Sequence, residues 1–254
     1  MNNTLKNGFK VLEFLAEKAE AYSVKELAQV FKLPNSHICR LLKTLKDTGY
    51  IAQDSSRKYV ISLKILNLSH ACLSRLEIRN RLRPFVKKLS EELKLPVYLS
   101  IPLNWHPIVV DVAQPEGKVI DPVISIGSMN PIHVSATGKI CAAFHPQETL
   151  DEFLATVSFS KITEKTIGDP KSFKVELAKI RKEKFAITNM ERSDNISAIA
   201  SPVFNCEGEL AAVIGVSFSP PDMKESDLRK LREKTYEAAE NSSYALGYAL
   251  YKAV

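Results

Sequence analysis

The sequence lacks the features that mark membrane and secreted proteins. No apolar run reaches the roughly eighteen residues that a membrane-spanning helix needs. The N-terminal segment alternates apolar side chains with Lys and Glu, and no small-residue cleavage site follows it, so we expect no signal peptide. These two absences predict a cytoplasmic protein with no membrane partner.

Cysteine is scarce. The four cysteines, Cys39, Cys72, Cys141 and Cys206, lie far apart and form no CxxC pair. This spacing fits neither a zinc site nor a disulfide framework, and a reducing cytoplasm explains it most simply. We therefore expect four structural thiols and no bound metal.

Signatures of catalysis are missing as well. No HExxH or GxSxG pattern occurs in the sequence. Residues 134–139 approximate a phosphate-binding loop, but His133 replaces its first Gly and Ile140 replaces its final Ser or Thr. We therefore predict no catalytic residues, no cofactor and no enzymatic activity.

The positive charge is confined to one part of the chain. Residues 1–80 contain 13 Lys and Arg against 7 Asp and Glu, whereas the remaining residues contain 22 of each kind. The whole net charge of +6 thus belongs to the first third of the chain. A basic module joined to a neutral body indicates that one part binds a polyanion such as double-stranded DNA. Chance asymmetry is the alternative, because an excess of this size is modest.

The first third reads as three helices. Apolar residues recur at helical spacing over residues 5–18. Ser23 and Glu26 form a capping box for a second helix, and Asn35 and Ser36 are expected to cap a third that ends at Gly49. Only one of the 13 prolines lies in this region, which is consistent with mostly helical structure.

Two short β-prone runs follow the helices, at residues 50–53 and 58–61, and a polar turn joins them. This order of elements is that of a winged helix-turn-helix, with the third helix as the DNA reader. Arg40 can bind a guanine edge through two hydrogen bonds, and Lys43 and Lys46 suit phosphates. A solvated helix face is the alternative for any one of these residues. The predicted DNA-binding residues are Ser23, Lys25, Asn35, Ser36, His37, Arg40, Lys43, Arg57 and Lys58.

Residues 63–80 have a helical pattern whose apolar arc is too wide for one contact surface. Such a helix suits a linker that packs on its own domain and pairs with a second subunit through residues such as Leu66 and Leu73. An ordinary buried helix would give the same periodicity. We therefore expect a homo-oligomer that binds a palindromic operator.

The rest of the chain alternates helical and strand patterns, and several of the strands are joined by hairpin turns. The expected helices cover residues 81–93, 138–144, 173–184 and 224–254, and the expected strands 97–101, 108–112, 119–126, 200–204 and 210–218. The predicted fold class is α+β with a mostly antiparallel sheet. The domains are a winged helix-turn-helix at 1–62, a linker helix at 63–80 and an α+β domain at 81–254, to which the resemblance described next gives an effector-binding role.

Three stretches of the chain resemble the IclR family of bacterial transcriptional regulators. Residues 27–51 are similar to the family pattern LAxxxGLPxSTxxRLLxTLxxxGYV. Residues 131–139, PIHVSATGK, are similar to PLHATALGK, and residues 185–217 contain the third match. The resemblance covers essentially the whole chain and implies a GAF-like effector domain in dimers or tetramers.

The resemblance also implies a pocket for a small organic effector. Its expected residues are Met129, Ala136, Thr137, Thr188, Ala198, Gly215 and Ser217. Thr188, Ala198 and Gly215 stand where the family commonly has Asp, Cys and Ser, so we expect a roomier and less polar pocket. Such a pocket favours a larger, aromatic or partly apolar molecule with one anionic or carbonyl end.

The leading hypothesis is therefore a sequence-specific transcriptional regulator that a small organic effector controls. The alternative is a GAF-like interaction or signalling module attached to a DNA-binding domain that has lost its response to small molecules. The substituted pocket positions motivate this alternative. Thermal-shift screening against small acids, aromatics and sugars separates the two, because a ligand that binds the folded state stabilises it.

Overall fold

The computed structural model describes residues 2–115, 124–220 and 224–248. The chain divides into two compact units, residues 1–75 and residues 76–254. Each unit is described by itself below. Within the described residues, no helix is long and apolar enough to cross a membrane.

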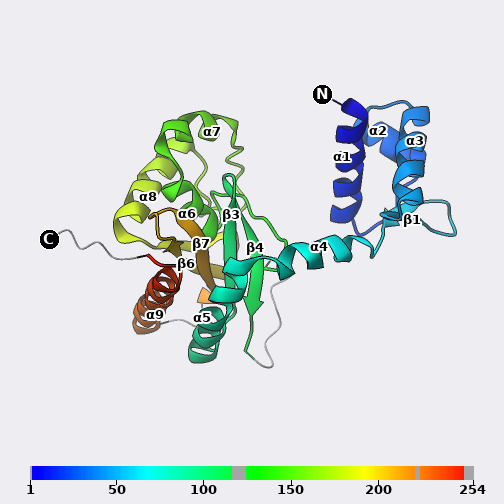
Figure 1. The fold of residues 1–254 in the computed structure, drawn as a ribbon. Coiled ribbons are helices and arrows are strands. Elements are labelled where there is room, and N and C mark those ends of the chain that lie inside the picture. The colour runs from blue at the N-terminus through cyan, green and yellow to red at the C-terminus, as the bar shows by residue number, and fades with distance from the viewer. Residues whose placement is uncertain (1, 116–123, 221–223, 249–254) are drawn as a thin grey trace. The chain divides into compact units, whose positions relative to one another are not determined.

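The first unit contains four helices and a two-stranded hairpin in its described part (Figure 1). The elements are α1 (Asn3–Glu17), α2 (Val24–Phe31), α3 (Asn35–Asp47), β1 (Ile51–Gln53), β2 (Tyr59–Ile61) and α4 (Ile65–Ser74). Helices α1 to α3 pack around a core formed by Val11, Leu15, Leu27, Ile38, Leu41, Leu42 and Ile51. The order of elements confirms the predicted winged helix-turn-helix.

Local signals fix the ends of these helices. The Ser23 hydroxyl accepts a hydrogen bond from the Glu26 amide, and the Glu26 carboxylate accepts one from the Ser23 amide, which confirms the predicted capping box. Gly49 has a φ of 80° just after α3, a conformation that glycine adopts without strain. The caps predicted for α3 were wrong. Pro34 is its N-cap, and Asn35 and Ser36 are already helical because Pro34 holds the backbone conformation that precedes a helix.

The predicted linker helix was also wrong in its extent. The chain leaves the helical conformation after Ser74, and a separate helix, α5, begins at Glu77. None of the residues of α4 is buried within the structure. The wide apolar arc of residues 63–80 therefore combines two helices, of which α4 belongs to the first unit and α5 to the second.

The second unit is an α+β domain. Its helices are α5 (Glu77–Leu93), α6 (Ala136–Phe144), the short 3-10 helix η1 (Gln147–Thr149), α7 (Leu150–Thr156), α8 (Pro170–Glu183) and α9 (Glu225–Ala245). Its strands are β3 (Val97–Leu103), β4 (His106–Ala113), β5 (Ala186–Ser193), β6 (Ile196–Phe204) and β7 (Leu210–Phe218). They form one sheet in the order β4-β3-β7-β6-β5, and every neighbouring pair is antiparallel, as predicted.

Helices cover both faces of this sheet (Figure 1). Helices α5 and α9 pack on one face, and α6 packs on the other with α8 behind it. The core on the α6 side of the sheet includes Ile140, Phe173, Leu177, Ala200 and Val213, all fully buried. This three-layer arrangement places the N-terminus of α6 directly over the middle of the sheet.

Some expected elements differ from those observed. The strand expected at residues 119–126 falls partly outside the described residues, and Ile124 to Ile126 form no strand. The residue pattern predicted no strand at β5 or over the first half of β6, and no helix at α7. Three of the four supposed structural thiols are exposed, and Cys141 alone is buried.

Candidate functional site

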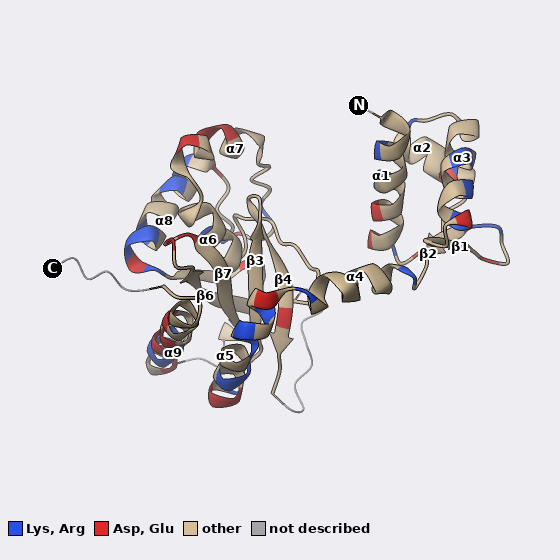
Figure 2. Ribbon diagram, viewed as in Figure 1, with Lys and Arg blue, Asp and Glu red and all other residues tan. Residues whose placement is uncertain are grey.

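Helix α3 presents a polar face to solvent. Its buried residues Ile38, Leu41 and Leu42 hold it against the core of the first unit. Arg40 and Lys43 lie on the opposite side and are exposed. Figure 2 shows Lys and Arg along α3 and in the turn between β1 and β2. A basic helix face flanked by a basic hairpin is suited to a nucleic-acid backbone.

Hydrogen bonds orient several side chains on this face. A His37 ring nitrogen lies 3.5 Å from an Arg40 guanidinium nitrogen, and the other lies 3.4 Å from the Asn7 side-chain amide of α1. The Lys46 ammonium donates to the Gln53 side chain of β1 at 2.8 Å. Lys46, which was predicted with Lys43 to suit a phosphate contact, lies on α3 beside the hairpin at the same surface.

Two predicted DNA-binding residues have structural partners. Ser23 caps α2, and the Lys58 ammonium lies 3.3 Å from the Glu26 carboxylate. Hydrogen bonds from the backbone and hydroxyl of Ser23, helped by Lys58, lower the pKa of Glu26 to about 2. Arg57 is exposed at the tip of the hairpin with a φ of 59°. Lys25, Asn35 and Ser36 are also exposed, while His37 is half-buried.

An apolar groove of about 610 Å³ lies beside this polar face, within the first unit. Its apolar lining comes from α1, α3 and α4, through Leu5, Phe9, Leu12, Leu41, Leu45 and Leu68. Leu5 and Phe9 are each more than half exposed. Leu66 of α4 is also exposed, and Leu73 is half-buried. Contiguous exposed apolar side chains of this kind mark a surface that another molecule covers.

The second unit contains a pocket of about 150 Å³ between α6 and the sheet. It is lined by Tyr98, Ile124, Asn130, Val134, Ser135, Ala136, Thr188, Arg192, Ser193, Ile196, Ala198 and Ser217. An apolar cavity of about this size accommodates a benzene molecule. The pocket can therefore hold an organic molecule of about one ring.

Donors gather where the pocket meets α6. Ala136 is the first residue of α6, and the first amides of a helix have no acceptor within it. The Ser135 hydroxyl caps the helix by accepting a hydrogen bond from the Gly138 amide at 3.1 Å. The Ser217 side chain is 6% exposed, and its hydroxyl has no hydrogen-bond partner among the described residues. An anion or a carbonyl oxygen at this end would gain the helix dipole and satisfy the hydroxyl.

The structure brings together four of the seven predicted effector-binding residues. Ala136, Thr188, Ala198 and Ser217 line the pocket. The Thr188 hydroxyl is engaged by the backbone of Ala198, whose amide donates to it at 3.1 Å. The remaining three, Met129, Thr137 and Gly215, are not among the lining residues, and Met129 is 48% exposed.

Gly215 lies under the Tyr98 ring and not in the pocket lining. The two residues are directly paired between β7 and β3, and a Cβ on Gly215 would lie 2.4 Å from Cζ of the Tyr98 ring. The absence of a side chain at Gly215 therefore makes room for the tyrosine ring and adds no volume to the pocket. Tyr98 was not predicted, because its position over Gly215 depends on strand pairing between distant segments.

Arg192 and Asn130 also line the pocket and were not predicted. The Arg192 guanidinium donates a hydrogen bond to the Asn130 side-chain oxygen. Arg192 thus brings a positive charge to a pocket that sequence reasoning had described as less polar. No local pattern in the sequence marks Arg192 as a pocket residue, because its placement depends on contacts with distant segments.

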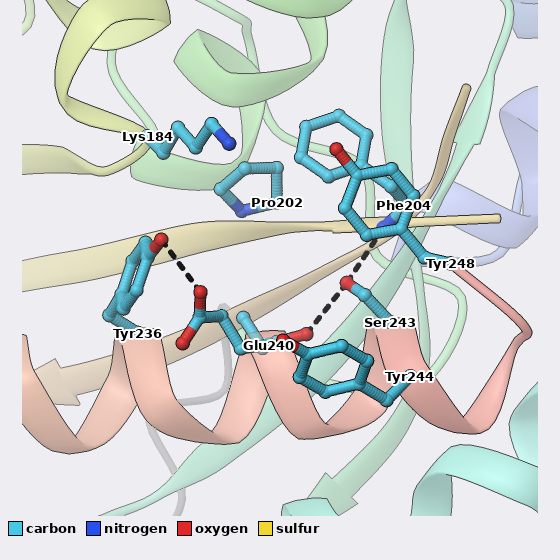
Figure 3. Close-up of a pocket in the computed structure, with 9 residues that line it drawn as sticks. Lys184, Pro202, Phe204, Tyr236, Glu240, Ser243, Tyr244 and Tyr248 are labelled. Atoms are coloured by element: carbon cyan, nitrogen blue, oxygen red, sulfur yellow. Dashed lines mark hydrogen bonds between the residues drawn. The ribbon is translucent and has the colours of Figure 1, made fainter. Parts of the chain in front are cut away.

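A second hollow lies between α9 and the end of β6 (Figure 3). Its volume of about 20 Å³ holds about one water molecule. Internal hydrogen bonds hold its walls: the Tyr236 hydroxyl donates to Glu240 at 3.0 Å, and the Phe204 amide donates to the Ser243 hydroxyl at 3.0 Å. Burial, with the carboxylate of Glu240, raises the pKa of Tyr236 to about 12. This hollow is a packed junction that is too small for an organic effector.

Both units match models of one protein family. Residues 4–55 match the family model of the IclR helix-turn-helix domain, and residues 70–244 match that of the bacterial transcriptional regulator IclR C-terminal region. The regulator KdgR of Dickeya chrysanthemi is 28% identical over 244 residues, which cover 96% of this chain and 79% of that protein. The regulator XynR of Escherichia coli is 25% identical over 247 residues, which cover 96% of this chain and 97% of that protein.

A solved structure agrees with these matches over nearly the full length. The crystal structure of the Thermotoga maritima IclR protein superimposes with a TM-score of 0.72 at 27% identity, covering 98% of this chain and 100% of that one. The matches extend over the helix-turn-helix unit and the pocket-bearing unit alike. The chain therefore belongs to the IclR family of bacterial transcriptional regulators, as a DNA-binding protein with a C-terminal effector domain.

Proposed function

We propose that this chain is a cytoplasmic, sequence-specific regulator whose affinity for its operator is controlled by a small organic effector in the pocket beneath α6. The observation that carries this proposal is the buried Ser217 hydroxyl, which has no hydrogen-bond partner in the described part of the chain and lines the pocket together with the first residue of α6. A buried polar group left unsatisfied costs about 1–3 kcal/mol, so its retention in a pocket points to an occupant.

The effector is a partly apolar or aromatic molecule with one anionic or carbonyl end. Ile124, Val134, Ile196 and the Tyr98 ring supply apolar walls, and the end of α6 supplies donors. A molecule that matched only the donors would leave these walls in contact with water. One that matched only the walls would leave Ser217 unsatisfied.

Thermal-shift screening of the purified protein against small organic acids, neutral aromatics and sugars tests this assignment. An aromatic or partly apolar acid is expected to raise Tm in a concentration-dependent way, since binding to the folded state stabilises it. Ala198→Trp fills the pocket and is the matched control, expected to abolish the shift. If no compound raises Tm, or if Ala198→Trp responds as the wild type does, the effector assignment is wrong.

DNA binding is assigned to α3 and the hairpin of the first unit. Arg40→Ala is expected to weaken operator binding by about 1–3 kcal/mol and relax the preference at one base position, because Arg reads guanine through paired hydrogen bonds. Arg57→Ala is expected to weaken binding to all sequences alike, as loss of a phosphate contact does. Affinity for randomised duplexes at several salt concentrations measures both effects. An Arg40→Ala protein with unchanged affinity and preference would remove Arg40 from the reader.

The protein is proposed to bind a palindromic operator as a homodimer or tetramer. The exposed apolar groove formed by α1, α3 and α4 supports this arrangement, because a second copy would cover it. Leu66→Glu in α4 is expected to shift sedimentation toward a smaller species and weaken operator binding. A wild-type protein that is monomeric at micromolar concentration and still binds its operator would contradict this proposal.

A further inference from the structure

The effector pocket of the second unit has a second polar wall, formed by residues that do not belong to α6. Arg192 is on β5, Asn130 is in the segment before α6, and their side chains are joined by a hydrogen bond. Ser193 lines the pocket beside them. These groups come from a hairpin arm and a loop, whereas Ala136 and Ser217 come from a helix and a central strand. The pocket therefore offers two sets of donors from different elements.

The backbone of β5 leaves regular pairing just before Arg192. The register of β5 with β6 is interrupted between Thr188 and Ser193, and Met190 has a φ of 55°. A non-glycine residue in this conformation is uncommon and persists only where the surroundings hold it. Here the Met190 amide donates to the Ser197 hydroxyl at 3.2 Å, and the Thr163 hydroxyl donates to the Met190 carbonyl at 2.8 Å.

The neighbouring residue Glu191 anchors the same arm. Its carboxylate accepts a 2.7 Å hydrogen bond from Lys139, whose side chain is 1% exposed, and its carbonyl accepts one from Thr166 at 2.6 Å. Met190 and Glu191 are thus held by side chains from outside the strand: Met190 by Thr163, in the loop before α8, and Glu191 by Lys139 of α6 and by Thr166. Arg192 follows directly, so its backbone is held in place before any ligand arrives.

A pre-positioned arginine in a pocket has a specific use. Its planar guanidinium matches a carboxylate through paired hydrogen bonds, and it keeps its charge at any physiological pH. Asn130 constrains the guanidinium from one side through the hydrogen bond to its side-chain oxygen. The charge of Arg192 and the donors at the end of α6 both favour acidic groups, so an effector with two carboxylates can use both sets.

We infer that Arg192 is a specificity-determining residue and that the effector is a compact dicarboxylate of about one-ring size. One carboxylate binds Arg192, and the other binds the end of α6 with Ser217. This inference rests on the proposed function of the pocket and adds a second acidic end to the effector proposed there. The apolar walls and the volume of about 150 Å³ limit the carbon frame to roughly one ring.

Calorimetric titration of the full-length protein tests the inference with benzoate, isophthalate and terephthalate as probes. The wild type is expected to bind one of the two diacids at least tenfold more tightly than benzoate. Arg192→Met is expected to remove this preference, weakening the diacid at least tenfold while changing benzoate less than twofold. Arg229→Met is the matched control, since Arg229 is an exposed residue of α9, which packs on the other face of the sheet. Both variants are first checked for wild-type Tm without ligand.

Two other outcomes distinguish a failure of the role of Arg192 from a failure of the proposed effector pocket. If benzoate binds the wild type as tightly as either diacid and Arg192→Met changes neither, the role of Arg192 is wrong and the effector pocket stands. If none of the three acids binds the wild type, the acid-binding pocket is wrong and the inference fails with it. Arg192→Lys adds a further check: it keeps the charge without the planar fork and is expected to retain part of the diacid preference.

Discussion

The ion pair between Lys139 and Glu191 is expected to be a main support of the effector domain. The Lys139 ammonium lies 2.7 Å from the Glu191 carboxylate and 3.8 Å from that of Glu176. The side chains of Lys139 and Glu191 are 1% and 9% exposed. Replacing Lys139 by Met preserves most of its volume and leaves the Glu191 carboxylate buried without its cation.

The Lys139→Met variant is expected to lose much of its free energy of unfolding, because a buried charge without a partner is costly. Removing one partner of a buried pair typically destabilises a protein by about 3–5 kcal/mol. The pair between Lys174 and Asp151 is the matched control, because those side chains are 45% and 76% exposed. Losing an exposed pair of this kind costs about 0–1 kcal/mol.

Urea denaturation followed by tryptophan fluorescence measures both variants. The single tryptophan, Trp105, lies in the effector domain and stacks between His145 and Phe153, with ring centroids 3.5 Å and 4.0 Å away. In the Lys139→Met background, Glu191→Gln is expected to recover part of the loss because it removes the stranded charge. If Lys139→Met costs no more than Lys174→Met, the buried pair is not the support that we describe.

Three further predictions follow from individual side chains. Gly215→Ala is expected to destabilise the effector domain by about 1–3 kcal/mol in urea, because its Cβ would overlap the Tyr98 ring, and to cost less in a Tyr98→Ala background. An equal cost in both backgrounds would refute the overlap. Burial raises the pKa of the Cys141 thiol to about 12, so a thiol reagent is expected to modify the three exposed cysteines in the native protein and Cys141 only in urea. Rapid native modification of all four would contradict this. Because the pKa of Glu26 is lowered from 4.5 to about 2, the stabilisation from its ionised form is present above about pH 4.5 and is lost as the pH falls toward 2. An NMR titration of this carboxyl with a midpoint near 4.5 would show that the capping box does not hold it.

The helix-turn-helix could be predicted because its signals are local. The capping box of Ser23 and Glu26 spans four residues, and the end of α3 depends on Gly49 alone. The linker was misjudged because one apolar periodicity runs through two helices, and the break near Arg75 has no glycine or proline to mark it.

The effector pocket was only partly predictable because it depends on distant contacts. Tyr98 and Gly215 meet through strand pairing across 117 positions of the chain. Arg192 follows a bend in β5 that places it at the pocket. Lys139 helps to hold this bend through its hydrogen bond to Glu191, 52 residues further along the chain. Neither contact leaves a periodic pattern in the sequence, and the interrupted pairing of β5 removed the alternation that would have predicted a strand.

Occupancy of the pocket is expected to change the affinity of the protein for DNA. The direct measurement is fluorescence anisotropy of the full-length protein on an operator selected from random duplexes, with and without the acid that gives the largest thermal shift. We expect the acid to change the Kd for the operator at least fivefold, about 1 kcal/mol of coupling between the two sites, and to leave the Kd of the Ala198→Trp protein unchanged. An operator Kd that is the same at saturating acid and in its absence, while the acid still raises Tm, would contradict this expectation.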